Sequence, residues 1–269
     1  MIEHSHSRSQ HGEDLLVAEW FGYKRGGYFV EVGALDGESY SNTFLLEHEL
    51  GWTGVLVEAN PVQAAVCQKK RPGAITVAKA VTSPSMAGML LDFNVVDGYQ
   101  ALSTVNMTDF TRDLISLMNQ AQEGELSVRT VKVESTTLDS ALGAANTPSD
   151  IDFMSIDIEG HELEALHGFS LGERWCPKIL LIENNGVLPN LPISLLLARC
   201  GYGYVRTVGG INDWYEPRTK VRIVGCMAVQ WCRSLPKIVQ FVVRRGLGSI
   251  GLLGLARNLR NRLKDGTAP

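Results

Sequence analysis

One stretch near the N-terminus constrains the fold of this chain more than any other: the sequence GYFVEVGALDG at residues 27–37. Its apolar first half has the composition of a short buried parallel strand, and the turn that follows contains Gly33 and Gly37. Glycine permits positive φ and lets the backbone come close to a ligand, as a nucleotide-binding turn after a first strand requires. A loose pair of glycines is weak evidence by itself, because an ordinary tight turn has the same composition.

A second strand candidate, GVLVE at residues 54–58, strengthens that interpretation. It ends in Glu58, and an acid at the end of a second strand accepts hydrogen bonds from the hydroxyls of a ribose. The glycine loop contains Glu31 and Asp36 but no Lys or Arg, so it suits a pyrophosphate poorly. A sulfonium cofactor that carries an ammonium group fits this charge better. The loop also departs from G-x-G-x-x-G, which disfavours an NAD-dependent dehydrogenase, and the alternative for Glu58 is a solvated carboxylate.

Six segments, taken in order, resemble the FkbM-type S-adenosylmethionine-dependent methyltransferases: SQHGED at 9–14, FVEVGALDG at 29–37, SNT at 41–43, GWTGVLVEANP at 51–61, TLD at 137–139 and IDIEGHE at 156–162. The resemblance spans residues 9–225. It implies an α/β, Rossmann-like class I methyltransferase fold, with a mostly parallel seven-stranded sheet and a C-terminal antiparallel hairpin. It also implies O-methylation of a hydroxyl on a sugar, glycan or other natural product, with S-adenosyl-L-methionine as cofactor, and it does not name the acceptor.

Within that fold we expect the cofactor to lie along the first three strand ends. Glu31 is assigned to its amino-acid end and Glu58 to its ribose. Ala80 and Val81, at the end of a third strand over residues 74–81, are assigned to the rim of the adenine pocket. The full set of expected contacts is Glu31, Gly33, Ala34, Asp36, Gly37, Asn42, Glu58, Ala59, Asn60, Ala80 and Val81.

The acceptor chemistry is expected at the carboxyl ends of the later strands, where ligands bind in parallel α/β sheets. Glu31, Asp157 and Glu183 are acidic strand ends that meet there. Buried like charges repel, so a cation must neutralise them: the ammonium and sulfonium of the cofactor, a base of the protein, or a metal.

Methyl transfer to oxygen depends on alignment and on removal of the hydroxyl proton. We predict Asp157, Glu159 and His161 as the catalytic residues, with histidine best suited by its pKa. For His161 the alternative is a solvent-facing helix residue. For Glu159 it is an acid favoured at a helix N-terminus.

A magnesium site is a further hypothesis. Asp157, Glu183 and Asn184 are similar to the metal ligands of catechol-type O-methyltransferases, where oxygen ligands hold Mg²⁺ against two acceptor oxygens. Glu183 stands where that pattern has aspartate, and no lysine follows shortly after Asp157. The alternative is that Asp157 orients the acceptor and Glu183 accepts a hydrogen bond from it.

Domain boundaries follow from the element pattern. Residues 1–232 form the predicted methyltransferase domain, closed by a hairpin of strands 202–208 and 221–229. Residues 82–129, with a strand over 86–92 and a helix over 107–122, are an insertion that we interpret either as an acceptor-site lid or as an elaborated surface. Residues 233–269 form a basic amphipathic tail.

Charge is distributed unevenly along the chain of 269 residues, whose net charge is −4. The tail has eight basic residues and one acid, and the first 232 residues have 17 basic and 28 acidic residues. An acidic body argues against nucleic acid as partner. The tail fits an anionic membrane surface, a partner or a second copy of the chain, and a membrane-tethered nucleotide-binding scaffold without catalysis is the rival of the enzyme hypothesis.

The expected location is the cytoplasm, with membrane association through the tail. Five scattered cysteines form no C-x-x-C pair, which is typical of a reducing compartment. The first ten residues are polar and lack the apolar segment of a signal peptide. No stretch of about 20 apolar residues is present to span a membrane.

Overall fold

A computed structural model describes residues 6–107, 109–121, 126–184 and 190–218 of the chain. Its centre is a seven-stranded sheet in the order β3-β2-β1-β7-β8-β10-β9. Neighbouring strands from β3 to β8 pair in parallel, and β10 pairs antiparallel with both β8 and β9. The strands are β1 (Tyr28–Val32), β2 (Thr53–Val57), β3 (Ile75–Val77), β7 (Phe153–Ile156), β8 (Ile179–Glu183), β9 (Tyr202–Val208) and β10 (Asn212–Pro217).

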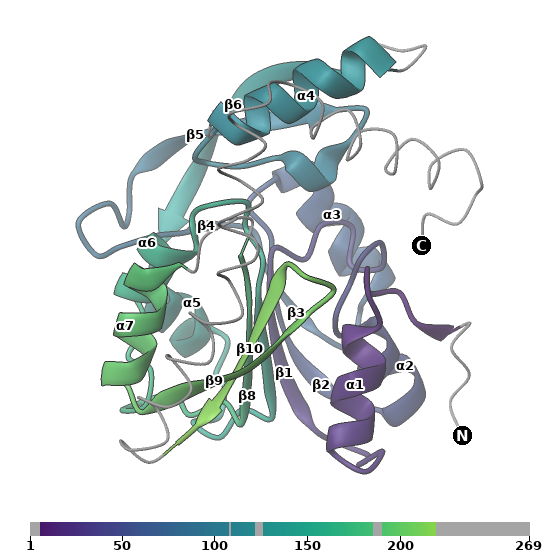
Figure 1. The fold of residues 1–269 in the computed structure, drawn as a ribbon, viewed down its shortest axis with the longest axis vertical. Helices are drawn as coiled ribbons and strands as arrows, with labels where there is room; N and C mark the ends of the chain where they lie inside the picture. The colour runs from purple at the N-terminus through teal and green to yellow at the C-terminus, as the bar shows by residue number, and fades with distance from the viewer. Residues whose placement is uncertain (1–5, 108, 122–125, 185–189, 219–269) are drawn as a thin grey trace, which may run out of the picture.

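Helices cover both faces of this sheet, so that the domain has three layers (Figure 1). One face carries α1 (Glu13–Trp20), α2 (Phe44–Leu50) and α3 (Pro61–Lys70), and the other carries α5 (Leu138–Ala144), α6 (Glu162–His167) and α7 (Leu191–Arg199). Alternate strand residues supply the two cores. Phe29 packs with the first helix set and Val30 with the second. Both faces of the strand are therefore buried, which explains why its sequence is a nearly continuous apolar run.

Side-chain caps fix two helix starts in the segments that the sequence motifs occupy. The Asn60 side chain accepts from the N–H of Val62, and Pro61 is the first residue of α3. Thr137 caps α5 by accepting from the N–H of Ser140. An N-cap acceptor satisfies a backbone donor that has no partner within the helix, so these helices begin at defined residues beside the strand ends.

A smaller module is inserted between the third and fourth strands of the sheet. It consists of β4 (Ala80–Val81), β5 (Leu90–Asp97), the 3-10 turn η2 (Gln100–Leu102), α4 (Asp109–Ala121) and β6 (Ser127–Thr136). β6 pairs antiparallel with β5 along its length and parallel with β4 at its end. Figure 1 shows the module above the carboxyl ends of the main sheet, and its role as an acceptor-site lid stays a prediction.

Three sequence-based assignments need correction. The third strand does not run over residues 74–81: β3 ends at Val77, the chain turns, and Ala80 and Val81 join the small sheet instead. The strand expected over 86–92 is β5 and begins at Leu90. The partner of β9 in the terminal hairpin is β10, because the two glycines at 209–210 turn the chain back at once. Residues 221–229 and the tail at 233–269 lie outside the described residues.

No helix among the described residues has both the length and the apolar character needed to cross a bilayer. Cys67, Cys176 and Cys200 are free thiols in this part of the chain.

Candidate active site

The glycine turn after β1 is shaped by the packing of the chain itself. Gly33 has a φ of +90°, and its N–H donates to the carbonyl oxygen of Val57 at the end of β2 (2.9 Å). The N–H of Ala34 donates to the same oxygen (3.1 Å). A Cβ added at Gly33 would collide with the carbonyl oxygen of Asp157. Glycine is required here because three strand ends converge, and the turn therefore lies directly beside the predicted catalytic aspartate.

Glu31 anchors the segment that follows the glycine turn. Its carboxylate is buried and accepts from Ser41 Oγ (2.8 Å), Thr43 Oγ1 (2.6 Å) and the N–H of Asn42 (2.6 Å). Burial raises the pKa of Glu31, while Arg71 and the three donors oppose that rise. The Asn42 amide donates to Ser155 Oγ on β7 (2.9 Å). Contact of Glu31 and Asn42 with the amino-acid end of a cofactor stays a prediction.

Arg71 is a residue beneath the glycine loop that sequence reasoning missed. It is fully buried, although it lies at the end of α3, and its guanidinium donates to Glu47 (2.6 Å) and to the carbonyl oxygen of Gly37 (2.7 Å). The guanidinium also lies over the rings of Phe29 and Phe44, 5.3 and 5.5 Å from their centroids. A buried cation beneath the glycine loop has no local sequence signal, because α2, β2 and α3 separate Arg71 from Gly37 in the chain.

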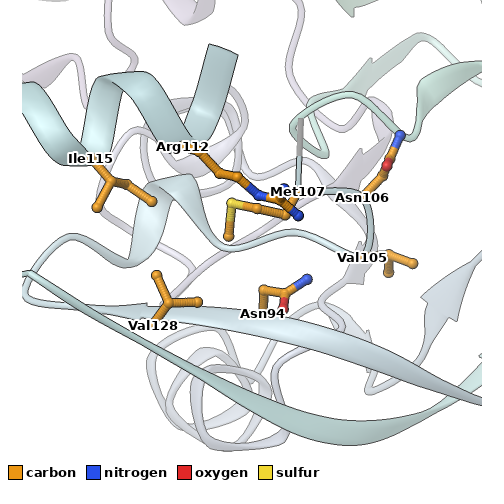
Figure 2. A pocket seen from close by; sticks show the side chains of 7 residues that line it. All are labelled: Asn94, Val105, Asn106, Met107, Arg112, Ile115 and Val128. Carbon is orange, nitrogen blue, oxygen red and sulfur yellow. The ribbon is translucent and has the colours of Figure 1, made fainter. Parts of the chain in front are cut away.

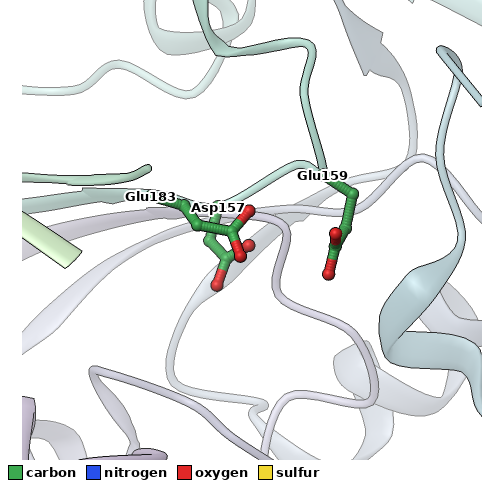
Figure 3. A group of neighbouring side chains, drawn as sticks. All are labelled: Asp157, Glu159 and Glu183. Atoms are coloured by element: carbon green, nitrogen blue, oxygen red, sulfur yellow. The ribbon is translucent and has the colours of Figure 1, made fainter. Parts of the chain in front are cut away.

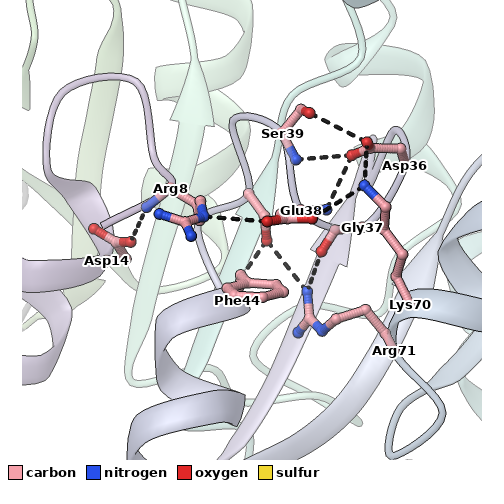
Figure 4. A network of polar contacts seen from close by, with 10 residues as sticks. Arg8, Asp14, Asp36, Gly37, Glu38, Ser39, Phe44, Lys70 and Arg71 are labelled. Atoms are coloured by element: carbon pink, nitrogen blue, oxygen red, sulfur yellow. Dashed lines mark hydrogen bonds and ion pairs between the residues drawn. The ribbon is translucent and has the colours of Figure 1, made fainter. Parts of the chain in front are cut away.

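The outside of the same loop is also held by cations from elsewhere in the chain (Figure 4). Lys70 Nζ contacts Asp36 (2.7 Å) and Glu38 (3.1 Å), and Arg8 Nε contacts Glu38 (3.3 Å). Hydrogen bonds with Lys70 and with two backbone N–H groups lower the pKa of Asp36 despite its partial burial. The loop has no base of its own, as the sequence indicated, but the fold brings Arg8, Lys70 and Arg71 to it.

Glu58 directly follows β2 and lies beside the glycine turn, where the ribose prediction expects an acid. Its two carboxylate oxygens accept from the N–H groups of Leu35 (2.8 Å) and Asn60 (2.7 Å). Burial raises the pKa of Glu58 to about 7. The solvated alternative is therefore wrong, because the carboxyl group is almost completely buried.

The predicted adenine side lies where the two sheets meet. Ala59 packs against a small-sheet core that contains Ala80 and Leu91, whereas Val81 belongs to the core under α5. Asn60 donates from Nδ2 to Gln100 Oε1 of the inserted module (3.2 Å). These contacts join the insertion to the Glu58 strand end, and the adenine role of Ala59, Ala80 and Val81 stays a prediction.

Three carboxylates gather at the ends of β7 and β8 (Figure 3). Asp157, Glu159 and Glu183 offer oxygens that all lie within 4.8 Å of one another. Glu183 is buried, and its Oε2 has no hydrogen-bond partner among the described residues. An unpaired buried acceptor carries a desolvation cost, so this group fits a donor or cation that the described residues do not supply.

Burial and mutual repulsion keep part of this acidic group protonated. Glu183 has a pKa well above its usual range because of burial and the charges of Asp157 and Glu159. Burial also raises the pKa of Asp157, although a hydrogen bond from Glu183 opposes the rise. Glu183 is therefore the harder of the two to ionise.

The turn after Asp157 is strained and is held from two sides. Glu159 has a φ of +54°, unusual for a residue with a side chain, and Gly160 follows with +95°. Buried Glu162 accepts from the N–H groups of Ile158 (3.0 Å) and Gly160 (3.1 Å), and burial raises its pKa to about 7. Thr104 of the inserted module donates to the carbonyl oxygen of Glu159 (3.0 Å). Glu162 stood in the motif at 156–162, but its place in this turn was not foreseen.

His161 contacts the inserted module rather than a carboxylate of the acidic group. It precedes α6, and its Nε2 lies 3.1 Å from Thr82 Oγ1 at the start of the insertion. Burial lowers the pKa of His161, so the ring is neutral at pH 7. The solvent-facing alternative does not describe this half-buried side chain, and its catalytic role stays a prediction.

The oxygen set that the fold assembles differs from the predicted magnesium ligands. Glu159 completes the group with Asp157 and Glu183. The Asn184 side chain donates instead from Nδ2 to Asp213 (3.0 Å). Oxygen ligands suit Mg²⁺, but the amide that closes β8 is engaged with the hairpin strand.

Two further segments border the acidic group without a clear sequence signal. The rings of Tyr40, with a φ of +60°, and Tyr99 meet edge to face at 6.5 Å. Burial, Tyr40 and the charges of Glu159 and Asp157 raise the pKa of the Tyr99 hydroxyl, which therefore stays protonated. A tyrosine from the glycine loop and one from the insertion thus meet near the acids.

The N-terminal motif at 9–14 packs onto the terminal hairpin. His11 leaves no space for a side chain at Gly209, between β9 and β10. Glu13 is fully buried and accepts from Asn212 Nδ2 (2.8 Å). Asn212 pairs with Glu183 across β10 and β8, so this motif lies behind the acidic strand end.

These residues fit S-adenosyl-L-methionine in charge and position. The buried Glu58 carboxyl lies at the second strand end, and Glu183 Oε2 lacks a partner in the described part of the chain. A cofactor with an ammonium and a sulfonium supplies positive charge to such a site, whereas a pyrophosphate would add negative charge.

Comparison with known proteins agrees with the topology. The profile of the Methyltransferase FkbM domain matches residues 31–204, and no curated protein matches the chain. Similar solved structures include a TehB-like SAM-dependent methyltransferase from Corynebacterium glutamicum, with 11% identity, a TM-score of 0.42 and coverage of 78% of this chain and 89% of that one. A SAM-dependent methyltransferase from Aquifex aeolicus has 11% identity, a TM-score of 0.37 and coverage of 76% and 89%.

Methyltransferase FkbM from Methylobacillus flagellatus has 13% identity and a TM-score of 0.40, over 71% of this chain and 43% of that one. Likeness at such identities concerns the fold alone, and none of these comparisons supports Mg²⁺. The profile match covers more than half of the residues and includes the glycine turn, Glu58 and the acidic group. With a Rossmann-like class I methyltransferase sheet around that site, the chain belongs to the FkbM methyltransferase domain family.

Proposed function

We propose that this protein transfers a methyl group from S-adenosyl-L-methionine to a hydroxyl oxygen of a sugar, a glycan or another natural product. The observation that supports this most is the group of Asp157, Glu159 and Glu183 at the carboxyl edge of the sheet, one of whose buried oxygens has no partner among the described residues. It lies next to Gly33 and so beside the predicted cofactor turn.

The chain holds the cofactor side with groups that are already oriented. Glu58 is fixed by the N–H groups of Leu35 and Asn60, and this supports its proposed role as the acceptor for ribose hydroxyls. The cofactor, when bound, supplies an electrophilic methyl group on a cationic sulfur. Gly33 and Ala34 form the turn that keeps this end of the pocket close to Asp157.

On the acceptor side, Asp157 is the group that takes up the hydroxyl proton. Burial and the charges of Asp157 and Glu159 hold the pKa of Glu183 well above its usual range, so Asp157 is the member of the pair that ionises more readily. Glu159 lies on the strained turn, within reach of the same space. General base catalysis by a positioned carboxylate contributes about 10²–10⁴-fold to a rate.

The test has two arms. Calorimetry with S-adenosylhomocysteine measures cofactor binding, and we expect the affinity to fall in Glu58→Ala but to persist in Asp157→Asn. Transfer of labelled methyl groups to a panel of hydroxylated acceptors should fall by about 10²–10⁴-fold in Asp157→Asn, while Asp150→Asn, an exposed acid, should behave as the wild type.

Each arm has a contrary outcome. Failure of the wild type to bind S-adenosylhomocysteine would overturn the methyltransferase proposal and favour a scaffold without catalysis. Methylation of amines rather than hydroxyls in the acceptor panel would reject O-methylation and keep the cofactor assignment.

The partner that we propose is a small-molecule or glycan acceptor rather than nucleic acid. Peripheral membrane contact or self-association through residues 233–269 stays a prediction, because that tail lies outside the described residues.

A further inference from the structure

A separate pocket of about 500 Å³ lies inside the inserted module, between α4 and the β5–β6 sheet (Figure 2). α4 contributes Arg112 and Ile115, and the strands contribute Asn94 and Val128. Val105, Asn106 and Met107 complete the wall between them. Neither the acidic group nor the predicted cofactor contacts belong to this lining.

The lining combines three kinds of chemistry. Met107, Ile115 and Val128 are apolar, Asn94 and Asn106 carry amides, and Arg112 is the charged side chain of the lining. Figure 2 shows the Arg112 and Met107 side chains, which both line the pocket. Apolar walls with a few polar groups and one cation are typical of a small-molecule site, and a guanidinium matches the geometry of a carboxylate or phosphate.

One wall of the pocket is linked through Thr104 to the backbone of the turn that carries Glu159. Thr104 Oγ1 donates to the carbonyl oxygen of Glu159 (3.0 Å) and accepts from the N–H of Asn106 (3.0 Å). Asn106 is therefore two hydrogen bonds away from the strained turn that carries Glu159. A molecule bound in the pocket lies on the module that covers the reaction site.

The acidic group and the pocket in the inserted module carry opposite charge. Asp157, Glu159 and Glu183 lie together at the strand ends, and an anionic group brought among them would raise the repulsion that already shifts their pKa values. Arg112, on the inserted module, offers the opposite charge away from that group. An acceptor with both a reactive hydroxyl and an acidic group is accommodated only if the acidic group lies toward Arg112.

We propose that this pocket is the acceptor subsite and that Arg112 selects hydroxylated molecules bearing a carboxylate or phosphate, such as acidic sugars. The assignment rests on the proposed function, because it assumes an acceptor hydroxyl at Asp157. Arg112 thus sets specificity at a distance from the reacting atoms and takes no part in the proton transfer.

A direct binding readout tests the assignment without turnover. With ¹³C-methyl-labelled methionine, the Met107 resonance, assigned through Met107→Leu, is followed while glucuronate, glucose 6-phosphate or glucose is added. We expect the resonance to move with the two anionic sugars and not with glucose at the same concentrations. Arg112→Gln should weaken the response to the anions at least about tenfold, as loss of a charged hydrogen bond does.

Matched variants guard against a general effect of charge or folding. Arg129→Gln removes an exposed arginine of the same module that pairs with Asp97, and it should leave the titration unchanged. Arg112→Lys keeps the cation and should retain part of the response. Equal shifts with glucose and glucuronate, no shift with either anionic sugar, or an undiminished shift in Arg112→Gln would each overturn the proposal.

Failure here is distinguishable from failure of the methyltransferase proposal. S-adenosylhomocysteine binding, measured by calorimetry on the same samples, reports on the cofactor site alone. Intact binding without an anion-dependent Met107 shift rejects the subsite and keeps the methyltransferase. The reverse result keeps an anion pocket in the module and removes the cofactor assignment.

Discussion

The two halves of the site solve the problem of buried charge in opposite ways. Around the glycine loop the chain pairs its own groups: Glu31 accepts three hydrogen bonds, and Arg71 is enclosed by Glu47, the Gly37 carbonyl and two aromatic rings. At the ends of β7 and β8, acids face acids, and Glu183 Oε2 has no partner in the described part of the chain.

This difference distinguishes the part of the site that holds the local structure from the part that can interact with a ligand. Buried groups that are fully paired hold a unique local structure, whereas a buried acceptor left unpaired is costly unless a ligand completes it. The glycine-loop half is therefore held in place by the chain's own contacts, whereas the acidic half has a buried acceptor that no described residue satisfies. Variants that disturb the first half should act on stability, and variants in the second should act on pH response and activity.

The largest expected effect comes from Arg71→Met. Removing the buried guanidinium leaves Glu47 and the Gly37 carbonyl without their donor, and breaking a buried pair costs roughly 3–5 kcal/mol. Urea denaturation should show that loss. Lys70→Met removes the neighbouring, more exposed cation and should cost no more than about 1 kcal/mol. Equal losses for the two variants would contradict the distinction between buried core and surface.

Next in size is Gly33→Ala. The new Cβ would collide with the Asp157 carbonyl at a φ of +90°, so overpacking adds to backbone strain for a total of about 3 kcal/mol. Gly51→Ala is the control, since its φ of +66° is also positive but nothing lies within 4 Å of the added atom. It should lose only about 1–2 kcal/mol. Similar denaturation midpoints for the two variants would mean that the backbone at the three strand ends moves aside for the added methyl group at little cost.

In the acidic half, Glu162→Gln should change how stability depends on pH. Burial raises the folded pKa of Glu162 to about 7, so the folded protein binds more protons than the unfolded chain between about pH 4.5 and 7. Stability from this group is present at low pH and is lost as the pH rises through 7. Glutamine keeps an acceptor for the turn and removes the titration, which should increase stability at pH 8 by up to roughly 3 kcal/mol and change it little at pH 4.

The measurement for Glu162→Gln is urea denaturation of wild type and variant from pH 4 to pH 8. Parallel curves over that whole range would show that Glu162 titrates normally.

The smallest effect is expected for Thr104→Val. Thr104 belongs to the inserted module, and its hydroxyl contacts the turn that carries Glu159. The substitution removes the hydroxyl that donates to the Glu159 carbonyl, at a cost of about 1 kcal/mol. Hydrogen exchange at residues 158–160 should speed up, while exchange in β1 and β2 stays as in the wild type. Unchanged exchange at 158–160 would show that the module does not steady this turn.

The sequence predicted the elements whose causes are local. The apolar run of β1 with its glycine turn, the Asn60 cap with Pro61, and the short apolar strands β7 and β8 were all recognisable from composition and order. Acids at strand ends were predictable for the same reason, because the ends of parallel strands meet at one edge of a sheet.

Tertiary structure decided everything that depends on chain segments meeting from a distance. Residues 80–81 do not belong to the third strand, because they pair with Ser135 and Thr136 of β6, which lie far along the chain. β10 is the partner of β9 in the hairpin, because the turn at the two glycines directs the chain back alongside β8. Arg71 beneath the loop, Tyr99 beside Tyr40, and Thr104 on the Glu159 turn carry no local signal. Their hydrogen bonds and ring contacts depend on packing geometry, which periodicity and spacing do not encode.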